Sequence, residues 1–245
     1  MSPCATALQL LLPLPLREDM TFDSWVSDPG TRAVERALAH PAALPHPCLT
    51  LYGPPGCGKT HLLQAALSRH RRSQGEQAGL LLTGNDLARL VGQGDETALV
   101  TFLHARRTGS LLAVDDMDAI CSSSAAQEAL LYLHNEFRRA GKHLLLAARH
   151  SPAQLPALRA DLRSRLLAGL VLELSAPDTH TLERILLKMA RDRSIRMDRR
   201  VAAFLSQRLP RSVPALAEAL TLLDHASLTA ARPITIPLAK AALRL

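Results

Sequence analysis

The stretch GPPGCGKT at residues 53–60 constrains the fold of this chain more than any other. It fits the pattern G-x-x-x-x-G-K-[ST], and it lies between the apolar run CLTLY and the amphipathic stretch THLLQAALSRHRR. A strand, a glycine-rich loop and a helix in this order direct backbone N–H groups at a bound phosphate. The alternative is an ordinary strand–loop–helix turn without a ligand. The sequence therefore predicts a P-loop within an α/β domain.

The residue types of the loop each suit one part of phosphate binding. Glycines let the backbone wrap around a phosphate, Lys59 would reach the β- and γ-phosphates, and the hydroxyl of Thr60 would bind Mg²⁺. ADP or ATP with Mg²⁺ is the expected ligand, and the sequence leaves open which nucleotide is the working one. The predicted nucleotide-binding residues are Gly53, Pro54, Pro55, Gly56, Cys57, Gly58, Lys59 and Thr60.

Further apolar runs predict the rest of a sheet. They are continuous rather than alternating, as expected for parallel strands that are covered on both faces. Helical patterns separate them, which favours a parallel α/β sheet of five strands flanked by helices. One of these helices, from about Ala125 to Arg139, is followed by Gly141, which suits a C-cap. The five expected strands are residues 48–52, 79–84, 110–116, 143–148 and 170–174.

The pattern changes after Pro177, where no strand of any length is expected. Four helical stretches follow, which predicts a small all-helical domain behind the α/β domain. The expected division is a peptide and linker at 1–20, a nucleotide-binding domain at 21–175 and a helical lid at 176–245. The expected lid helices are residues 179–191, 201–209, 213–226 and 238–243.

The third expected strand ends in acid, as LLAVDD. A buried strand that ends in carboxylates is how P-loop proteins hold Mg²⁺. Asp115 would orient the water shell of the metal, and Asp116 would polarise the attacking water. Such a strand end is common by itself and gains meaning from its place downstream of a P-loop.

The stretch RADLRSRL carries Arg159, Arg163 and Arg165 within two helical turns. An arginine here would reach the γ-phosphate held by a neighbouring subunit and neutralise charge in the transition state. Arg165 is the predicted residue for that role. The alternative is a basic helix that faces solvent.

Charge is distributed unevenly along the chain. The formal net charge is +7, and residues 176–245, with 12 Lys and Arg and 6 Asp and Glu, account for +6 of it. A basic region suggests non-specific contact with nucleic acid or an acidic partner, and the alternative is a solvated helical surface. The ten histidines and four cysteines form no cluster with metal-ligand spacing, which argues against a zinc site.

The apolar start QLLLPLPL at residues 9–16 is not a signal peptide by pattern. No Lys or Arg precedes Gln9, two prolines interrupt the apolar run, and the charged Arg17, Glu18 and Asp19 follow at once. No later run reaches the roughly 18 apolar residues of a membrane-spanning helix. The sequence predicts a soluble, cytoplasmic chain without a membrane partner.

Together these motifs resemble the AAA+ ATPases. More narrowly, TFDSWV, GPPGCGKTHLLQA, LLAVDDMDAI and LRSRL are similar to the nucleotide-binding module of the bacterial replication initiator DnaA, from Thr21 onward. The resemblance implies an AAA+ fold and an arginine finger at Arg165 that acts in trans. The initiators carry an additional helicase-recruiting domain and a domain that reads DNA, and neither is expected in this sequence.

The opening stretch is similar to peptides that dock into the groove of the bacterial DNA polymerase III β sliding clamp. An extended, unstructured peptide suits such a groove, and prolines favour it. This resemblance implies a clamp-bound regulator that stimulates ATP hydrolysis by DnaA and so prevents re-initiation. Leu11 stands where such peptides carry a small polar residue. The predicted clamp-binding residues are Gln9, Leu10, Leu12, Pro13 and Leu14.

Three positions depart from the family pattern. Ala148 and Arg149 stand where the family has polar or acidic sensor residues, and Pro214 stands where it has a sensor arginine. Strong ATP hydrolysis by the chain itself is therefore not expected, although the P-loop is complete. Two other hypotheses for the function stay open: a free-standing ATPase of the helicase-loader type, and a nucleotide-dependent scaffold. Assembly with further copies of the chain also stays open.

Overall fold

The computed structural model describes residues 16–44, 46–92 and 109–245. The chain divides into two compact units. The first comprises Arg32–Gly53 and Lys59–Leu174 with the described residues before Val26. The second comprises Val26–Thr31, Pro54–Gly58 and Ser175–Leu245.

The first unit is built on a five-stranded, fully parallel sheet in the order β2-β3-β4-β1-β5. This confirms the expected parallel sheet. Strand β1 lies between β4 and β5, and the loop that follows β1 begins at the carboxyl edge of the sheet. Ligands of open α/β sheets bind at that edge. The strands are β1 Cys48–Tyr52, β2 Gly79–Thr83, β3 Leu111–Asp115, β4 His143–Ala148 and β5 Leu170–Glu173.

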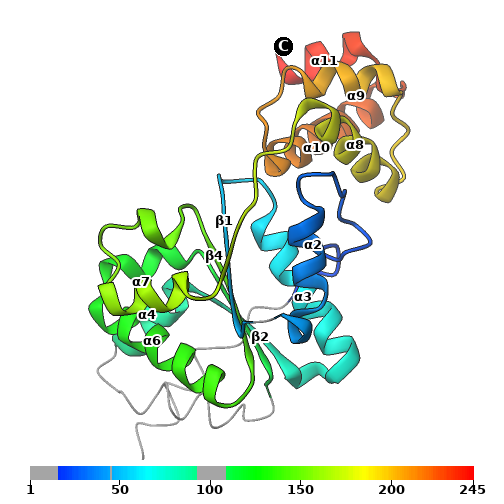
Figure 1. The fold of residues 1–245 in the computed structure, drawn as a ribbon. Helices are drawn as coiled ribbons and strands as arrows, with labels where there is room; N and C mark the ends of the chain where they lie inside the picture. The colour runs from blue at the N-terminus through cyan, green and yellow to red at the C-terminus, as the bar shows by residue number, and fades with distance from the viewer. Residues whose placement is uncertain (1–15, 45, 93–108) are drawn as a thin grey trace, which may run out of the picture. The chain divides into compact units, whose positions relative to one another are not determined.

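Helices cover both faces of this sheet (Figure 1). One face carries α2 (Arg32–Ala39) and α3 (Lys59–Gln74). The other carries α4 (Gly84–Gly92), α6 (Ser124–Arg139) and α7 (Ala160–Leu167). Short 3₁₀ turns lie at Pro41–Ala43, Glu76–Ala78, Met117–Ser122 (η3) and Pro152–Gln154 (η4). Helix α6 ends at Arg139, and Gly141 follows its C-cap as expected, with a positive φ of 63° that suits glycine.

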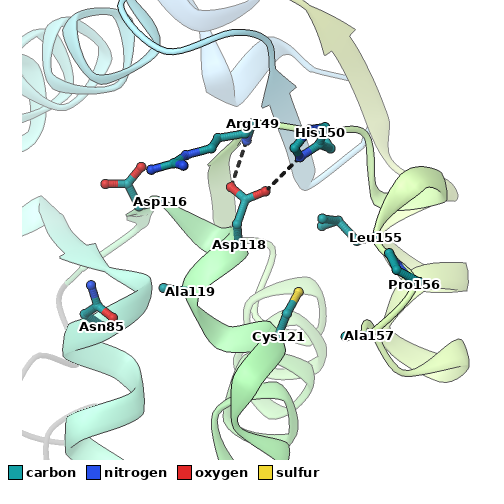
Figure 2. A pocket seen from close by; sticks show the side chains of 10 residues that line it. All are labelled: Asn85, Asp116, Asp118, Ala119, Cys121, Arg149, His150, Leu155, Pro156 and Ala157. Atoms are coloured by element: carbon teal, nitrogen blue, oxygen red, sulfur yellow. Dashed lines mark hydrogen bonds and ion pairs between the residues drawn. The ribbon is translucent and has the colours of Figure 1, made fainter.

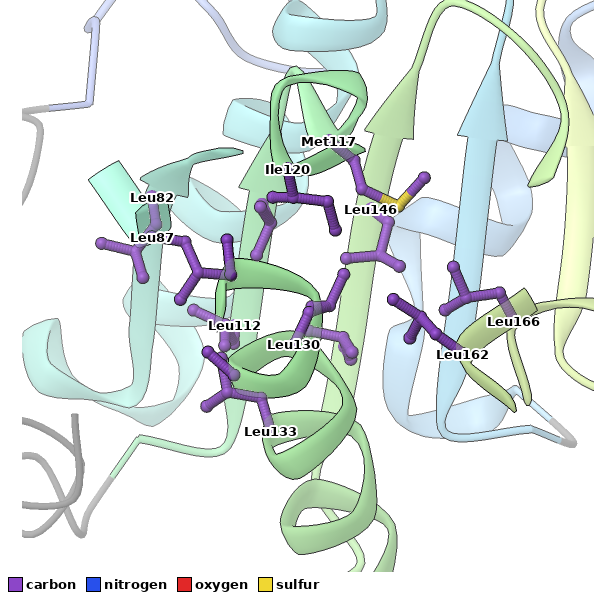
Figure 3. Close-up of a cluster of buried hydrophobic side chains, with 14 of the residues drawn as sticks. Leu82, Leu87, Leu112, Met117, Ile120, Leu130, Leu133, Leu146, Leu162 and Leu166 are labelled. Atoms are coloured by element: carbon purple, nitrogen blue, oxygen red, sulfur yellow. The ribbon is translucent and has the colours of Figure 1, made fainter. Parts of the chain in front are cut away.

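Leucines form the core between the sheet and α4, α6 and α7 (Figure 3). Alternate residues of the central strands, such as Leu112 and Leu146, point to this face and are at most 1% exposed. Leu130 of α6 and Leu162 of α7 pack against them and are fully buried. Each such side chain contributes roughly 1.5–3 kcal/mol when it is removed from water. In this chain, which has few aromatic residues, the packing of aliphatic side chains therefore holds the strands and their carboxyl ends in place.

The expected ends of three strands were wrong by one residue. Strand β3 begins at Leu111 rather than Ser110, and β5 ends at Glu173 rather than Leu174. Strand β2 stops at Thr83, and Gly84 already belongs to α4. The reason is a local cap, because Asp86 Oδ2 accepts hydrogen bonds from the N–H and the hydroxyl of Thr83 (2.9 and 2.7 Å). Strand β3 stops at Asp115, and Asp116 leaves it in the left-handed conformation with φ 48°. The sequence also predicts a helical stretch after the second strand, through Leu99 to Leu103, and that stretch falls partly outside the described residues.

The second unit is helical and has its own core. Its helices confirm that the four expected stretches are helical, and three of them extend beyond the expected bounds. The stretch expected at 201–209 is instead helical at Arg199–Ser206, because Asp198 caps its start two residues earlier and the helix ends three residues earlier. Leu182, Leu186, Leu205, Leu216 and Leu220 are fully buried at its centre. Among the described residues, no helix is both long and apolar enough to cross a membrane. The helices are α8 Thr179–Asp192, α9 Arg199–Ser206, α10 Val213–Ala230 and α11 Ile236–Leu243.

Candidate nucleotide-binding site

The loop after β1 has the backbone that a phosphate cradle needs. Gly56 and Gly58 have φ angles of 75° and 109°, a region that side chains other than glycine rarely enter. Lys59, the first residue of α3, is buried, and its Nζ donates to the carbonyl oxygen of Gly53 at 2.7 Å. The lysine ammonium is therefore held at the mouth of the loop rather than in solvent.

Thr60 and Asp115 meet across the sheet edge. The hydroxyl of Thr60 donates to Asp115 Oδ2 at 2.6 Å, and Oδ1 of the same carboxylate accepts the N–H of Asp116 at 2.9 Å. Burial raises the pKa of Asp115 above its ordinary value, and these hydrogen bonds lower it in part. The structure thus joins two residues that are 55 positions apart and that the sequence assigned to the same metal.

This pair fits Mg²⁺ bound together with a nucleotide. A hydroxyl and a carboxylate are hard oxygen ligands, and Mg²⁺ takes few protein ligands, with water and phosphates completing its shell. In the described part of the chain, no group of three or more His, Cys, Asp or Glu side chains could hold a metal alone. A buried carboxylate with a raised pKa also gains from a nearby cation.

Asp116 turns away from the strand next to this pair. It is exposed, and its φ of 48° places it in the left-handed region. Gly84 makes room for its backbone, because a Cβ at Gly84 would lie 2.5 Å from the Asp116 carbonyl oxygen. The missing side chain at the start of α4 therefore permits the turn that presents Asp116.

A pocket of about 440 Å³ opens where β3 and β4 end (Figure 2). Asp118 lies at its centre: Oδ2 accepts the Arg149 N–H at 2.7 Å, and Oδ1 lies 3.7 Å from His150 Nδ1. The Arg149 side chain runs across the mouth toward Asp116 (Figure 2). Asp118 thus fixes the loop after β4, and that loop places a cation beside Asp116. The pocket is lined by Asn85, Asp116, Asp118, Ala119, Cys121, Arg149, His150, Leu155, Pro156 and Ala157.

Two of the three positions that depart from the family pattern, Ala148 and Pro214, carry apolar side chains. Ala148 is the fully buried last residue of β4. Pro214 lies in the first turn of α10, where proline is well tolerated. Neither side chain has a polar group to offer a phosphate.

The segment before α2 packs onto the start of α3. His61, which follows Thr60, donates from Nε2 to the Thr21 carbonyl oxygen at 2.9 Å, and its ring meets the Trp25 ring edge-on at 5.4 Å. Burial lowers the pKa of His61. The segment TFDSWV is therefore anchored one residue beyond the P-loop.

The three arginines around α7 differ in their contacts. Arg159 is in ion pairs with Glu128 and Asp161. One nitrogen of Arg163, Nη2, donates to the carbonyl oxygens of Leu155, Pro156 and Leu158, so its guanidinium closes a turn.

Arg165 instead donates from Nη1 to the neutral side chain of Asn135 at 3.0 Å, and none of the described carboxylates forms a salt bridge with it. Its charge is thus held in place without being neutralised.

Sequence patterns missed three residues of this region. Asn135 holds Arg165, Asp118 holds the loop after β4, and Gly84 makes room for Asp116. Of these three residues, only Asp118 could have been found from the sequence, since it is the third acidic residue of the run DDMD. The predicted clamp-binding residues, Gln9, Leu10, Leu12, Pro13 and Leu14, lie outside the described residues.

Two known families match nearly the whole chain. Residues 16–173 match the bacterial DnaA ATPase domain, and residues 178–243 match the Hda lid domain. An uncharacterized protein of Haemophilus influenzae is 31% identical over 238 residues, which cover 97% of this chain and 99% of that protein. The chromosomal replication initiator protein DnaA of Magnetococcus marinus is 32% identical over 91% of this chain and 51% of its own length. The chain thus spans about half the length of that initiator.

Comparison with solved structures supports the same fold. Domain III of the replication initiation protein DnaA from Thermotoga maritima has a TM-score of 0.84 at 25% identity and covers 94% of this chain and 98% of that one. A replication initiator DnaA bound to AMPPCP and single-stranded DNA has a TM-score of 0.74 at 22% identity, over 85% of this chain and 66% of that one. The AAA+ fold is therefore confirmed. The chain belongs to the bacterial DnaA ATPase-domain family and, with its lid, is an Hda-type DnaA-related protein.

Proposed function

We propose that this chain is a regulator of DNA replication initiation that binds ADP or ATP with Mg²⁺ and stimulates ATP hydrolysis by the initiator DnaA. The observation that carries the proposal is Arg165, an uncompensated cation held by Asn135, in a chain that joins a DnaA-type ATPase domain to an Hda lid. This regulator would act in the cytoplasm and inactivate the initiator after replication starts.

The nucleotide would lie in the loop at residues 53–60. Lys59 and the loop N–H groups would bind its phosphates, and Thr60 and Asp115 would hold Mg²⁺, which offsets phosphate charge. A solved DnaA that binds AMPPCP supports this assignment by its fold. The role of the nucleotide here would be to hold the loop and its surroundings in the form that a partner recognises.

Arg165 would act on the site of a neighbouring initiator molecule. An arginine finger supplied in trans neutralises charge in the transition state and contributes roughly 10³–10⁵ in rate. Arg159 and Arg163 are poor candidates, because the first is paired with two carboxylates and the second closes a turn. The hydrogen bond to Asn135 would hold the Arg165 guanidinium ready for use.

The β clamp would hold the regulator through Gln9, Leu10, Leu12, Pro13 and Leu14. This part of the proposal depends on the amino-acid pattern alone. A clamp anchor would place Arg165 where replication is under way, so that DnaA is switched off only after initiation.

The deciding experiment measures ATP hydrolysis by DnaA with the β clamp loaded on DNA and with the full chain added. The wild type should stimulate hydrolysis, and Arg165→Ala should lose the stimulation while it still binds the clamp. Arg159→Gln is the matched control, since it removes an arginine from the same segment and should keep most of the stimulation. Full stimulation by Arg165→Ala would refute the role of this residue.

A second arm tests the anchor. Gln9→Ala with Leu14→Ala should abolish clamp binding and the clamp-dependent part of the stimulation. Strong ATP turnover by the isolated chain, unaffected by removal of residues 1–16, would instead favour the helicase-loader function. Absence of any partner-stimulated or DNA-stimulated hydrolysis would favour the scaffold.

A further inference from the structure

Helices α9 and α11 of the second unit, and the residues that follow them, carry basic side chains and no acidic ones, and Asp198 precedes α9 as its N-cap. Residues 199–211 and 236–245 contain no Asp or Glu. Arg200, Arg208, Lys240 and Arg244 are all exposed, and we call these four residues the basic face. None of them forms a salt bridge with any residue in the described ranges. These four cations therefore have no carboxylate partner among the described residues.

One aromatic ring joins the two helices of the basic face. The guanidinium carbon of Arg208 lies 4.0 Å from the centroid of the Phe204 ring, and Lys240 Nζ lies 5.7 Å from the same centroid. The negative face of an aromatic ring attracts cations, so Phe204 of α9 gathers Arg208, which follows α9, and Lys240 of α11. Two like charges at one ring repel each other, and a bound anion would relieve that repulsion.

Other basic side chains of the second unit are engaged in contacts. Arg199 pairs with Glu183 (2.8 Å), and Lys188 pairs with Asp192 (3.5 Å). Arg193 donates to the Thr221 hydroxyl at 3.0 Å, and Arg184 donates to the Ser27 carbonyl oxygen at 3.0 Å. Arg199 and Lys188 thus have carboxylate partners, and Arg184 and Arg193 have neutral ones outside the basic face.

We propose that the basic face binds the phosphate backbone of double-stranded DNA without reading its sequence. Four cations without carboxylate partners, on two adjacent helices and just beyond their C-terminal ends, suit a row of phosphates, which supply most of the affinity in non-specific binding. Single-stranded nucleic acid is bound largely by stacking of bases on exposed aromatic rings. Phe204, the one aromatic residue of 176–245, is half-buried with Arg208 against its ring. The face therefore lacks a stacking platform, which favours a duplex.

This inference does not rest on the proposed stimulation of DnaA, and its test needs no hydrolysis. Fluorescence anisotropy would measure binding of the full chain to two labelled 20-base-pair duplexes of unrelated sequence over a range of salt concentrations. Neutralisation of four phosphates gives a slope of about −3.6 for the logarithm of the binding constant against that of salt. We expect this slope and similar affinities for both duplexes.

The decisive variant is Arg200→Gln with Lys240→Gln, which should reduce the slope by about two, since each phosphate contact contributes about one. The matched control is Arg184→Gln with Arg193→Gln, which removes the same charge from side chains that are engaged in other contacts. It should change the slope by no more than about one from the wild-type value. Phe204→Leu keeps an apolar side chain but releases Arg208 and Lys240, and should weaken binding less than the decisive variant. Thermal unfolding of each variant checks the fold.

Three results would overturn the proposal. Equal losses in the decisive variant and the control would mean that only net charge matters. A strong preference for one duplex would contradict backbone recognition. Binding to poly-glutamate but not to the duplexes, abolished by Arg200→Gln with Lys240→Gln, would assign the basic face to an acidic protein surface instead.

Discussion

Nη1 of Arg165 on α7 donates a hydrogen bond to Oδ1 of Asn135 on α6 at 3.0 Å. The two residues are 30 positions apart, and helix packing brings them together. Because an amide oxygen accepts a hydrogen bond without neutralising the guanidinium, the contact orients Arg165 and preserves its charge. A carboxylate in the same place would orient it equally well but would compete with a phosphate.

The first prediction concerns this pair. Asn135→Ala should lower stimulation of DnaA about tenfold, because it removes one hydrogen bond to a charged group. Asn135→Asp should be more damaging, since an ion pair would neutralise Arg165. Hydrolysis by DnaA with the loaded clamp measures both effects, and clamp binding serves as the control. If Asn135→Asp stimulates as well as the wild type, the charge of Arg165 is not used.

A second prediction concerns Asp115. Burial raises its pKa, so the ionised form is disfavoured in the folded state, and the cost is present at pH values above both its folded and its unfolded pKa. Asp115→Asn removes that cost and keeps an acceptor for the Thr60 hydroxyl. The nucleotide-free variant should therefore melt at a higher temperature, with roughly 2–4 °C for each kcal/mol gained in a chain of this size.

The same variant should lose its response to magnesium. Calorimetry with ATP should show a Mg²⁺-dependent gain in affinity for the wild type and little gain for Asp115→Asn. Thr60→Val, which removes the hydroxyl and leaves the carboxylate, separates the two ligands. Asp115→Asn could lose the Mg²⁺ response without being more stable than the wild type. That result would disprove the predicted cost of ionising Asp115 in the folded state and leave its role as a metal ligand standing.

Arg149 leads to a third prediction. Its side chain runs toward Asp116 at the mouth of the pocket (Figure 2), so a positive guanidinium attracts the carboxylate that would polarise the attacking water. Arg149→Asn should therefore raise ATP hydrolysis by the isolated chain, by about tenfold or more, since a polar group positioned at the reaction contributes on this scale or above. Arg149→Asn with Asp116→Asn should return hydrolysis to the original level. Nucleotide affinity, measured separately, should change little in either variant.

Much of the fold was readable because the strands are continuous apolar runs. CLTLY, LLAVD and HLLLAA appear in the structure as β1, β3 and β4, and their burial on both faces explains the pattern. The pairing of Thr60 with Asp115 also followed from the sequence, because Asp115 ends one strand and Thr60 follows another at the carboxyl edge of one parallel sheet. These features depend on local patterns and on a regular topology.

The supporting contacts were not readable, because they depend on packing between distant elements. Asn135 has no distinguishing neighbour within α6, and only the approach of α7 gives it a role. The turn at Asp116 depends on Gly84, which belongs to α4 but which the apolar pattern had assigned to the preceding strand. Such contacts are chosen by three-dimensional fit, and periodicity carries no signal for them.

The last prediction concerns two histidines at the edge of the sheet opposite the P-loop. His70 Nε2 lies 2.7 Å from the Ser110 hydroxyl, and His143 Nδ1 is buried without a hydrogen-bond partner among the described residues. Burial lowers the pKa of both histidines, and the charge of His143 lowers that of His70 further. Protonation is thus disfavoured in the folded state.

The pH dependence of stability follows from the direction of these shifts. Because both folded pKa values lie below the unfolded value of about 6.5, the unfolded chain binds more protons below that pH. The stability is therefore present above pH 6.5 and lost as the pH falls from there through the folded pKa values. Urea unfolding of the full chain should show a lower midpoint at about pH 5.5 than at pH 7.5. His143→Gln should reduce this difference, whereas His225→Gln, at an exposed position of α10, should leave it unchanged. Equal pH dependence in His143→Gln and the wild type would show that the acid sensitivity arises elsewhere.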